Sequence, residues 1–334
     1  MERSTATMAD VRTLLAGIVA ALLPLTLAAC TSSQDAADDG PLEVVAAIYP
    51  LQYVAEQVGG DRVHVVGLVA PGTQPHDAPL DAELTAKLDD ADVVLFLSGF
   101  QPAVDTAVTS SDTSSDTGAD GPVLVDAASH TGDVAIAHDH HAMLPPAPPS
   151  AEPSADPSPS PSTPGPPADP HFWLDLSRMP SFAQHVAEQF TELDPSGSLT
   201  YERNAQNLTA QLADLDVRYA SGLLSCERRE VVSSHDAFGY LATRYNLHTA
   251  GILGTDPTTP PSTPDAAAAR ELAAGATTVF TEPLVDPRGA DELAAEVGAT
   301  TAVLDPIENV SGDDDFVSVA ERNLTTLRTA LGCS

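Results

Sequence analysis

Short apolar runs alternate with segments of helical periodicity along most of this chain, and this alternation limits the possible folds more than any other feature. A first series covers residues 42–125 and opens with a predicted strand from Leu42 to Ile48. A second series covers residues 230–331 and opens with a predicted strand from Glu230 to Ser233. Strands that alternate with helices form parallel sheets covered by helices. The sequence therefore predicts an α/β protein with two parallel-sheet lobes.

A long helix is predicted between the two series, from an N-cap at Ser198 to about Leu224. One apolar stripe recurs along it at spacings of three and four, made of Leu208, Leu212, Leu215, Tyr219 and Leu223. A helix of about 26 residues spans roughly 39 Å, which is more than one small domain needs. We expect a rigid connector over residues 178–225, between an N-terminal lobe (42–177) and a C-terminal lobe (226–334).

Two stretches of biased composition interrupt the first lobe. Residues 109–121 are rich in Ser, Asp, Thr and Gly, and residues 130–168 are dominated by Pro, Ser and Ala after a short histidine cluster. Segments of this composition cannot bury enough apolar area to fold. We predict that both are disordered insertions.

The N-terminus has the pattern of an export signal. Arg3 and Arg12 precede an apolar run that is shorter than a typical transmembrane helix, and the run ends in Leu27-Ala28-Ala29-Cys30. This ending resembles the lipobox of bacterial lipoproteins. We predict a signal peptide over residues 1–29, a lipid on Cys30 and a polar tether over 30–41. An ordinary secretory signal with a chance cysteine is the alternative; in both cases the mature protein is exported, and with the lipid it is a cell-membrane lipoprotein on the extracytoplasmic face.

The other two cysteines are predicted to pair. Cys226 precedes the first strand of the second lobe, and Cys333 follows its last helix. Both could therefore meet at one edge of that lobe. In an oxidising compartment a disulfide is favoured over two free thiols.

The charge balance excludes some partners. The chain has 48 acidic and 14 basic residues, for a formal net charge of -34. Nucleic acid is not an expected partner, and neither is an anionic membrane surface bound by charge. We expect a monomer.

Four residues at predicted loop positions suit a metal ion. His76, His235 and Asp305 follow predicted strands, where open α/β sheets place ligand sites. His171 leaves a turn that is stiffened by Pro170 and followed by Phe172 and Trp173. Three imidazoles and one carboxylate suit tetrahedral zinc. A structural role stays open for each residue alone, but the joint placement, with two ligands per lobe, favours a metal site.

Four segments carry a family resemblance. They are Pro75-His76-Asp77, Asp169-Pro170-His171-Phe172-Trp173-Leu174-Asp175, Ser234-His235-Asp236-Ala237-Phe238-Gly239-Tyr240 and Leu304-Asp305-Pro306. In this order they resemble the signature segments of the zinc/manganese-binding receptors of ABC uptake systems. The resemblance implies two pseudo-symmetric lobes joined by one rigid helix, the metal in the cleft between them, and delivery to a membrane permease.

The same resemblance bears on the choice of metal. The third ligand position is His in zinc-type receptors and Glu in manganese-type ones, so His235 favours Zn²⁺, with Mn²⁺ as the runner-up. A His-rich loop stands between the first two ligands in many zinc-type members. His138, His140 and His141 occupy that place and are predicted to form a weak auxiliary site; a solvated loop with chance histidines is the alternative.

Other functions share some of these residues. A manganese- or iron-binding homologue, or an adhesin lipoprotein with a bound metal, would share every motif. A secreted zinc hydrolase would need an open coordination position and a base, for which Glu282 is a candidate. The chain has no H-E-x-x-H or G-x-S-x-G motif, and a fourth protein ligand closes the shell. We therefore expect a binding protein and not an enzyme.

Overall fold

The computed structural model describes residues 40–112, 121–130, 169–259 and 262–334, which belong to one compact unit. The predicted signal peptide, the lipidation site Cys30 and the three histidines of the auxiliary loop lie outside these ranges. So do most residues of the two predicted insertions. No helix within the described ranges is long and apolar enough to cross a membrane.

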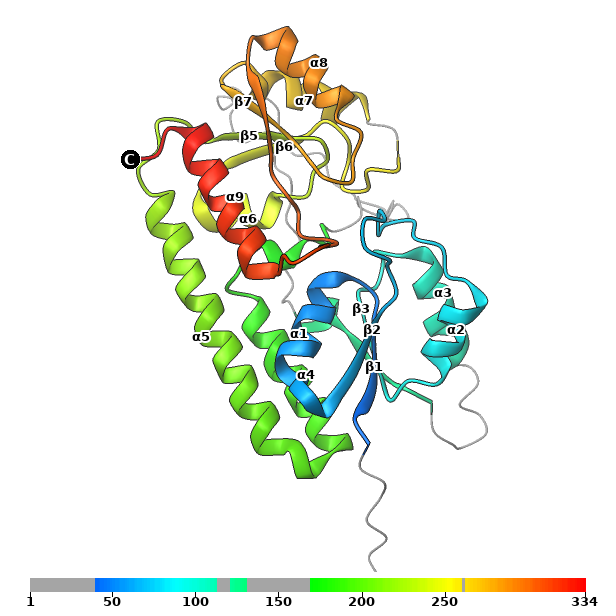
Figure 1. Cartoon of the computed structure of the whole chain (residues 1–334). Helices are drawn as coiled ribbons and strands as arrows, with labels where there is room; N and C mark the ends of the chain where they lie inside the picture. Colours follow the sequence, from blue (N-terminus) through cyan, green and yellow to red (C-terminus); the bar gives the residue numbers. More distant parts are fainter. Residues whose placement is uncertain (1–39, 113–120, 131–168, 260–261) are drawn as a thin grey trace, which may run out of the picture. The chain divides into compact units, whose positions relative to one another are not determined.

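The first lobe is a four-stranded parallel sheet in the order β2-β1-β3-β4. Its strands are β1 (Leu42–Ala46), β2 (Val63–Gly67), β3 (Val93–Phe96) and β4 (Val123–Asp126). Its helices are α1 (Tyr49–Gly59), α2 (Ala82–Asp89) and α3 (Pro102–Asp112). Figure 1 shows α2 and α3 on one side of this sheet and α1 on the other.

The second lobe repeats the arrangement, with the strand order β6-β5-β7-β8. Its strands are β5 (Glu230–Ser233), β6 (His248–Gly251), β7 (Thr278–Thr281) and β8 (Thr300–Val303). Its helices are α6 (Gly239–Tyr245), α7 (Thr263–Ala273), α8 (Arg288–Val297) and α9 (Phe316–Leu331). Two parallel-sheet lobes with the same strand order confirm the predicted fold class.

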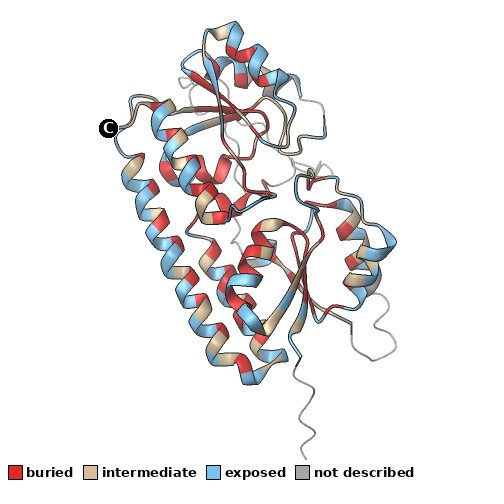
Figure 2. Cartoon of the chain, viewed as in Figure 1, coloured by how far each residue is buried: buried red, intermediate tan, exposed pale blue. Residues whose placement is uncertain are grey.

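Alternate residues of each strand face different cores. Val45 of β1 packs with α2 and α3 on the outer face of the first sheet, whereas Val44 joins a larger inner core. Val232 of β5 likewise belongs to an outer core with α7 and α8, and Val231 to the inner one. The inner core is continuous through both lobes, and Figure 2 shows its buried residues in red along the strands and along the inner sides of α4 and α5.

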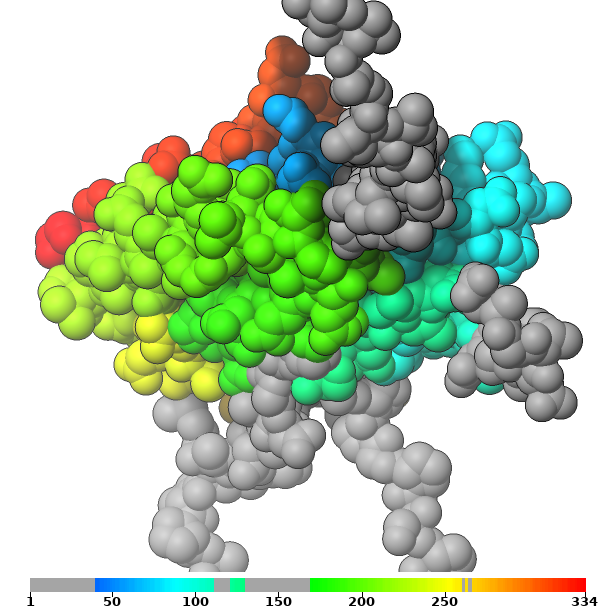
Figure 3. Space-filling model, turned by 90° about the horizontal axis from the view of Figure 1, so that it is seen from below, coloured from blue at the N-terminus to red at the C-terminus, as the bar shows by residue number. Residues whose placement is uncertain are grey.

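The connecting segment consists of α4 (Met179–Leu193) and α5 (Ser198–Gly222), which cover one face of this unit in Figure 3. Asn204 of α5 donates a hydrogen bond to the Val58 carbonyl of the first lobe at 3.0 Å. Tyr219, fifteen residues further along the same helix, donates to the Ala320 carbonyl of α9 at 2.6 Å. The helix therefore contacts both lobes. Ser198 is its first residue and not its N-cap, which is Gly197.

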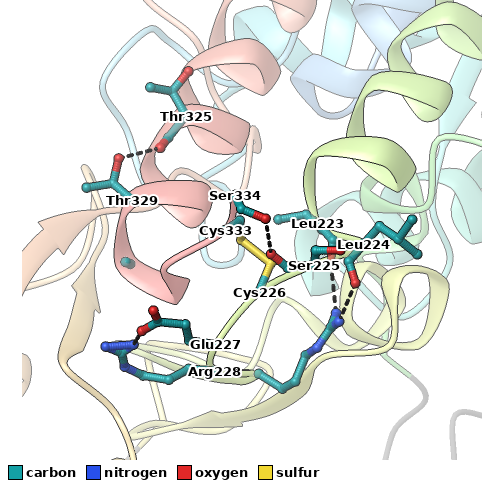
Figure 4. The surroundings of a disulfide bond; sticks show 12 residues. Leu223, Leu224, Ser225, Cys226, Glu227, Arg228, Thr325, Thr329, Cys333 and Ser334 are labelled. Atoms are coloured by element: carbon teal, nitrogen blue, oxygen red, sulfur yellow. Dashed lines mark hydrogen bonds and ion pairs between the residues drawn. A yellow bond between two sulfur atoms is a disulfide. The ribbon is translucent and has the colours of Figure 1, made fainter.

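The C-terminal lobe is closed by a disulfide between Cys226 and Cys333 (Figure 4). The bond joins the chain just before β5 to the residue after the C-cap of α9, and backbone hydrogen bonds run alongside it, including Arg228 N to Leu331 O at 3.1 Å. The predicted pairing of the two cysteines is confirmed.

Candidate metal centre

Three histidines and one glutamate converge on a single point. His76, His171, His235 and Glu308 each offer one ligand atom, and these atoms all lie within 4.8 Å of one another. Glu308 Oε1 lies 3.3 Å from Nε2 of His76, 2.8 Å from Nε2 of His171 and 3.2 Å from Nε2 of His235. The Nε2 atoms of His171 and His235 are 3.4 Å apart.

These spacings suit a small tetrahedral ion. Around an ion with ligand distances of about 2.0–2.1 Å, tetrahedral ligand atoms lie roughly 3.3 Å apart. The measured separations bracket that value. All four side chains are buried, with His171 and His235 fully so. A buried set of three neutral imidazole nitrogens and one carboxylate oxygen can hold Zn²⁺ with four protein ligands.

Both lobes contribute to the cluster through loops at strand ends. His76 lies in the loop after β2, and His171 lies beyond β4, just before a short 3-10 helix (Phe172–Leu174). His235 comes two residues after β5, and Glu308 lies in the loop after β8. The carboxyl ends of parallel strands share one edge of a sheet, which brings these loops together. Three of the four residues predicted as ligands thus lie side by side.

Asp305, the fourth predicted ligand, is not part of this cluster, and Glu308 takes the place expected for it. The Asp305 carboxylate accepts a hydrogen bond from Ile307 N at 2.7 Å, so it stabilises the turn of its own loop. Asp side chains often bond the backbone two residues ahead in this way. Burial raises the pKa of Asp305 to about 6. The Asp-Pro pair predicted the strand end correctly, but an Asx turn was the better interpretation of the aspartate.

An unusual backbone conformation explains why Glu308 faces the histidines. Ile307 has φ of 59°, in the left-handed region that β-branched residues rarely adopt. Its side chain is buried, and the turn before it is held by the Trp173 indole, which donates to Pro306 O at 2.7 Å. Strain of this kind costs about 1–3 kcal/mol and persists only where surrounding contacts impose it. Here those contacts direct Glu308 into the cluster.

Two further carboxylates lie behind the histidines. Asp169 Oδ1 accepts from the backbone N of His171 at 2.9 Å and lies 2.7 Å from its Nδ1. Glu282 contacts His235 in the same manner, with Oε1 2.8 Å from the backbone N and Oε2 in a short contact with Nδ1. A carboxylate accepts at Nδ1, so Nε2 of each ring is left to face the ion. The ring of His76 instead packs on Phe100, with centroids 4.1 Å apart.

The buried charges shift the proton affinities of the site. Burial opposes a charged ring at His235, but Glu282 and Glu308 outweigh it and raise the pKa of His235 well above its usual value. The pKa of His171 is raised too, against burial, by Asp169 and Glu308. Burial would raise the pKa of Glu308, yet His235, His171 and His76 hold it well below its usual range. Protons and a divalent cation therefore compete for the same nitrogens.

A protein-family model described as "Zinc-uptake complex component A periplasmic" (ZnuA) matches residues 44–330, which include both lobes and all four clustered residues. The chain belongs to the ZnuA family. This family description is that of an uptake component and not of an enzyme.

Several relatives in the ZnuA family are named for zinc. The zinc-binding lipoprotein AdcA of Streptococcus pneumoniae (strain R6) is 28% identical over 256 residues, which cover 73% of this chain and 45% of AdcA. The chain thus spans less than half the length of that relative. The high-affinity zinc uptake system protein ZnuA of Bacillus subtilis is 27% identical over 325 residues, covering 92% of this chain and 94% of that protein.

Solved structures have the same two-lobe fold. The Zn(II)-bound ZnuA-like domain of Streptococcus pneumoniae AdcA matches with a TM-score of 0.65 and 26% identity, over 87% of this chain and 99% of that domain. The laminin-binding protein Lmb of Streptococcus agalactiae matches with a TM-score of 0.69 and 22% identity, over 87% and 99%. At that identity the second match shows the shared fold alone.

Proposed function

We propose that this protein captures Zn²⁺ outside the cytoplasm through His76, His171, His235 and Glu308 and delivers it to a membrane permease of an ABC importer. The observation that carries the proposal is the buried set of three imidazole nitrogens and one carboxylate oxygen, supplied by two lobes of a ZnuA-family fold. Imidazole-rich four-coordinate shells suit zinc, whereas manganese prefers more oxygen donors.

A binding role fits this geometry better than catalysis. A catalytic zinc site keeps one position open for water or substrate, and here four protein groups surround the point where an ion would lie. Glu282, the candidate base of a hydrolase, is engaged with both the backbone and the ring of His235. A closed shell of four protein ligands leaves no position for a substrate, and in a family of zinc-uptake components we expect the bound ion to be the cargo.

The setting of the site also supports a receptor. The disulfide between Cys226 and Cys333 is typical of an exported protein. The lipobox-like ending at Cys30 would tether the mature, monomeric protein to the extracytoplasmic face of the membrane. From there it would pass its ion to the permease, with the His138–His141 cluster as a weak auxiliary site.

Zinc titration of the exported form tests the metal site. Wild-type protein should bind one Zn²⁺ tightly, and His171→Ala should lose most of that affinity because one of the four ligands is removed. His248→Ala is the matched control, since His248 is exposed at the start of β6 and does not belong to the cluster. Equal zinc affinity in wild type and His171→Ala would contradict the assigned ligands.

The zinc affinity should also fall with falling pH. A ligating imidazole must be neutral, and the carboxylates raise the pKa of His171 and His235 above the ordinary value of about 6.5. Proton competition should therefore begin above that pH and grow as the pH is lowered. Competition titrations at several pH values would measure this effect. A zinc affinity that stays constant between about pH 5 and 8, the range in which histidine changes its charge, would contradict imidazole ligation.

A further inference from the structure

We propose that Glu282 is a positioning residue of the metal site, which fixes the ring of His235 in the orientation and tautomer that present Nε2 to the ion. The inference rests on the proposed function, since it concerns the same ion. Glu282 itself is not a ligand, because it contacts Nδ1 of His235, whereas Nε2 is the ring nitrogen that lies in the cluster.

The contact is bidentate and local to one residue. Glu282 Oε1 accepts from the His235 backbone N at 2.8 Å, while Oε2 contacts the ring Nδ1 of the same residue. The hydrogen bond from the His235 backbone N fixes the position of the His235 backbone, and the contact at Nδ1 fixes the rotation of the ring. A carboxylate can only accept from Nδ1–H, so the lone pair of the neutral ring is on Nε2. That nitrogen lies 3.2 Å from Glu308 Oε1.

Strand pairing in the second sheet creates this contact. Ser233 of β5 is in register with Phe280 of the neighbouring parallel strand β7. His235 and Glu282 each lie two residues beyond these partners, so they leave the same edge of the sheet side by side. Since β5 and β7 are the two central strands, both residues emerge where the strand order reverses, the usual binding position in an open α/β sheet.

A purely structural role does not account for a carboxylate at this position. Glu282 is 5% exposed and His235 fully buried. Burying a charge is costly unless it is paired, and a glutamine would satisfy the backbone N–H of His235 at lower cost. What glutamine cannot guarantee is an acceptor at Nδ1. The carboxylate is therefore explained by the ring it orients.

The other two histidines show how specific this arrangement is. His171 has a carboxylate on Nδ1 as well, but Asp169 is only two residues away and separated from it by Pro170, whose ring already restricts the turn. His76 has a neutral neighbour, Gln74, whose Oε1 accepts from the His76 backbone N at 3.2 Å. Of the three histidines, only His235 has an orienting group from a segment distant in sequence, just beyond β7, so that group can be changed without altering the loop that carries the ligand.

The test is a zinc titration of Glu282→Gln, with Glu292→Gln as the matched control. The amide of glutamine can present an N–H to Nδ1, which favours the ring tautomer whose Nε2 carries the proton and cannot bind the ion. Loss of such an outer partner typically costs about 10- to 100-fold in metal affinity. Glu292 is an exposed residue of α8 in the same lobe, so its variant removes the same charge without touching His235, and its affinity should stay at the wild-type value.

A double-mutant cycle separates orientation from a general charge effect. In a His235→Ala background we expect His76, His171 and Glu308 to retain weak zinc binding. There Glu282→Gln should cause no further loss, because no ring is left to orient. An equal fold-loss in both backgrounds would overturn the proposal, as would wild-type affinity in Glu282→Gln itself.

Glu282→Asp provides a second variant should the glutamine variant fold poorly. It keeps the charge but is one methylene shorter, so it cannot reach both the backbone N and Nδ1. We expect an affinity loss here too, and full affinity would overturn the proposal. A wild-type protein that binds no zinc would overturn the proposed function together with this inference, whereas failure of the variants alone overturns only the role of Glu282.

Discussion

The two lobes share one strand order but use it differently. The last strands, β4 and β8, occupy equivalent positions, and each is followed by a ligand, His171 and Glu308. The remaining ligands break the equivalence, because His76 follows the edge strand β2 whereas His235 follows the central strand β5. A parallel sheet thus offers several strand ends for a site, and the side chains placed there decide which are used.

The lobes also differ in how they are fastened to the connecting helices. The second lobe has, besides the hydrogen bond from Tyr219 of α5 to Ala320 O, a covalent bond between Cys226, four residues beyond the end of α5, and Cys333. The first is fastened by polar contacts, in which Arg62 bonds Asp194 at 2.8 Å and Asp194 accepts from Tyr201 at 2.7 Å. The following predictions test whether these differences matter, from the largest expected effect to the smallest.

Trp173→Ala should have the largest effect, because this residue of the first lobe donates to the Pro306 carbonyl of the second. Replacing a fully buried tryptophan should lower the free energy of unfolding by about 3–5 kcal/mol. Trp173→Phe keeps most of the apolar area and loses the donor, so it should cost about 1–3 kcal/mol for the unpaired carbonyl. Urea denaturation measures both, and wild-type stability in Trp173→Phe would mean that the hydrogen bond between the lobes contributes nothing.

Removing the disulfide should come next. The bond closes a loop with a sequence separation of 107, and loss of a native bond of this kind typically costs about 2–4 kcal/mol. Cys226→Ser with Cys333→Ser should therefore show a lower urea midpoint than wild type, and reductant should lower the midpoint of wild type alone. If reductant left the wild-type midpoint unchanged, the covalent fastening would not stabilise the second lobe.

The helix caps allow a matched comparison of the lobes. Asp81 caps α2 of the first lobe by accepting from Glu83 N and Leu84 N, and Asp315 caps α9 of the second in a capping box with Ser318. Asp→Ala should cost about 1 kcal/mol at each, whereas Asp→Asn should be nearly neutral because asparagine caps equally well. Thermal unfolding of the four variants would measure these costs. A large cost at one cap alone would mean that the stability of the two lobes depends unequally on their helix caps.

The Arg62–Asp194 contact should have the smallest effect. The Arg62 side chain is 36% exposed, and exposed ion pairs contribute about 0–1 kcal/mol, so Arg62→Ala should destabilise within that range. Burial would raise the pKa of Asp194, but hydrogen bonds from Tyr201, Ser196 and Arg62 lower it from 3.8 to about 2. The stability from this group is thus present above the unfolded pKa and lost as the pH falls toward about 2. Acid titration of wild type and Arg62→Ala should show a shallower loss in the variant.

Most of the fold was predictable because each element has its own sequence pattern. The strand Glu230–Ser233 was predicted at its observed bounds, and the strand predicted from Leu42 to Ile48 is observed over Leu42–Ala46. Errors came at element ends, as at Ser198, where Gly197 takes the cap position because Asp194 stabilises the preceding turn.

The site was predictable as far as local pattern determines it. His76, His171 and His235 were predicted as ligands because they lie after predicted strands or beside Pro170. Glu308 was not predicted, because the direction of its side chain depends on the left-handed backbone of Ile307, which no local preference favours. The link between Glu282 and His235 depends on the pairing of β5 with β7, which is a property of the sheet and not of either segment.

The continuous inner core has a consequence for how the protein melts. Tyr53 of α1 stacks on Phe316 of α9 with ring centroids 5.2 Å apart, and the apolar side chains of α4 and α5 extend this contact between the halves. Neither half can lose its packing without exposing apolar surface of the other. The chain should therefore denature in one cooperative transition, with the calorimetric and van't Hoff enthalpies in agreement, and not as two domains in succession.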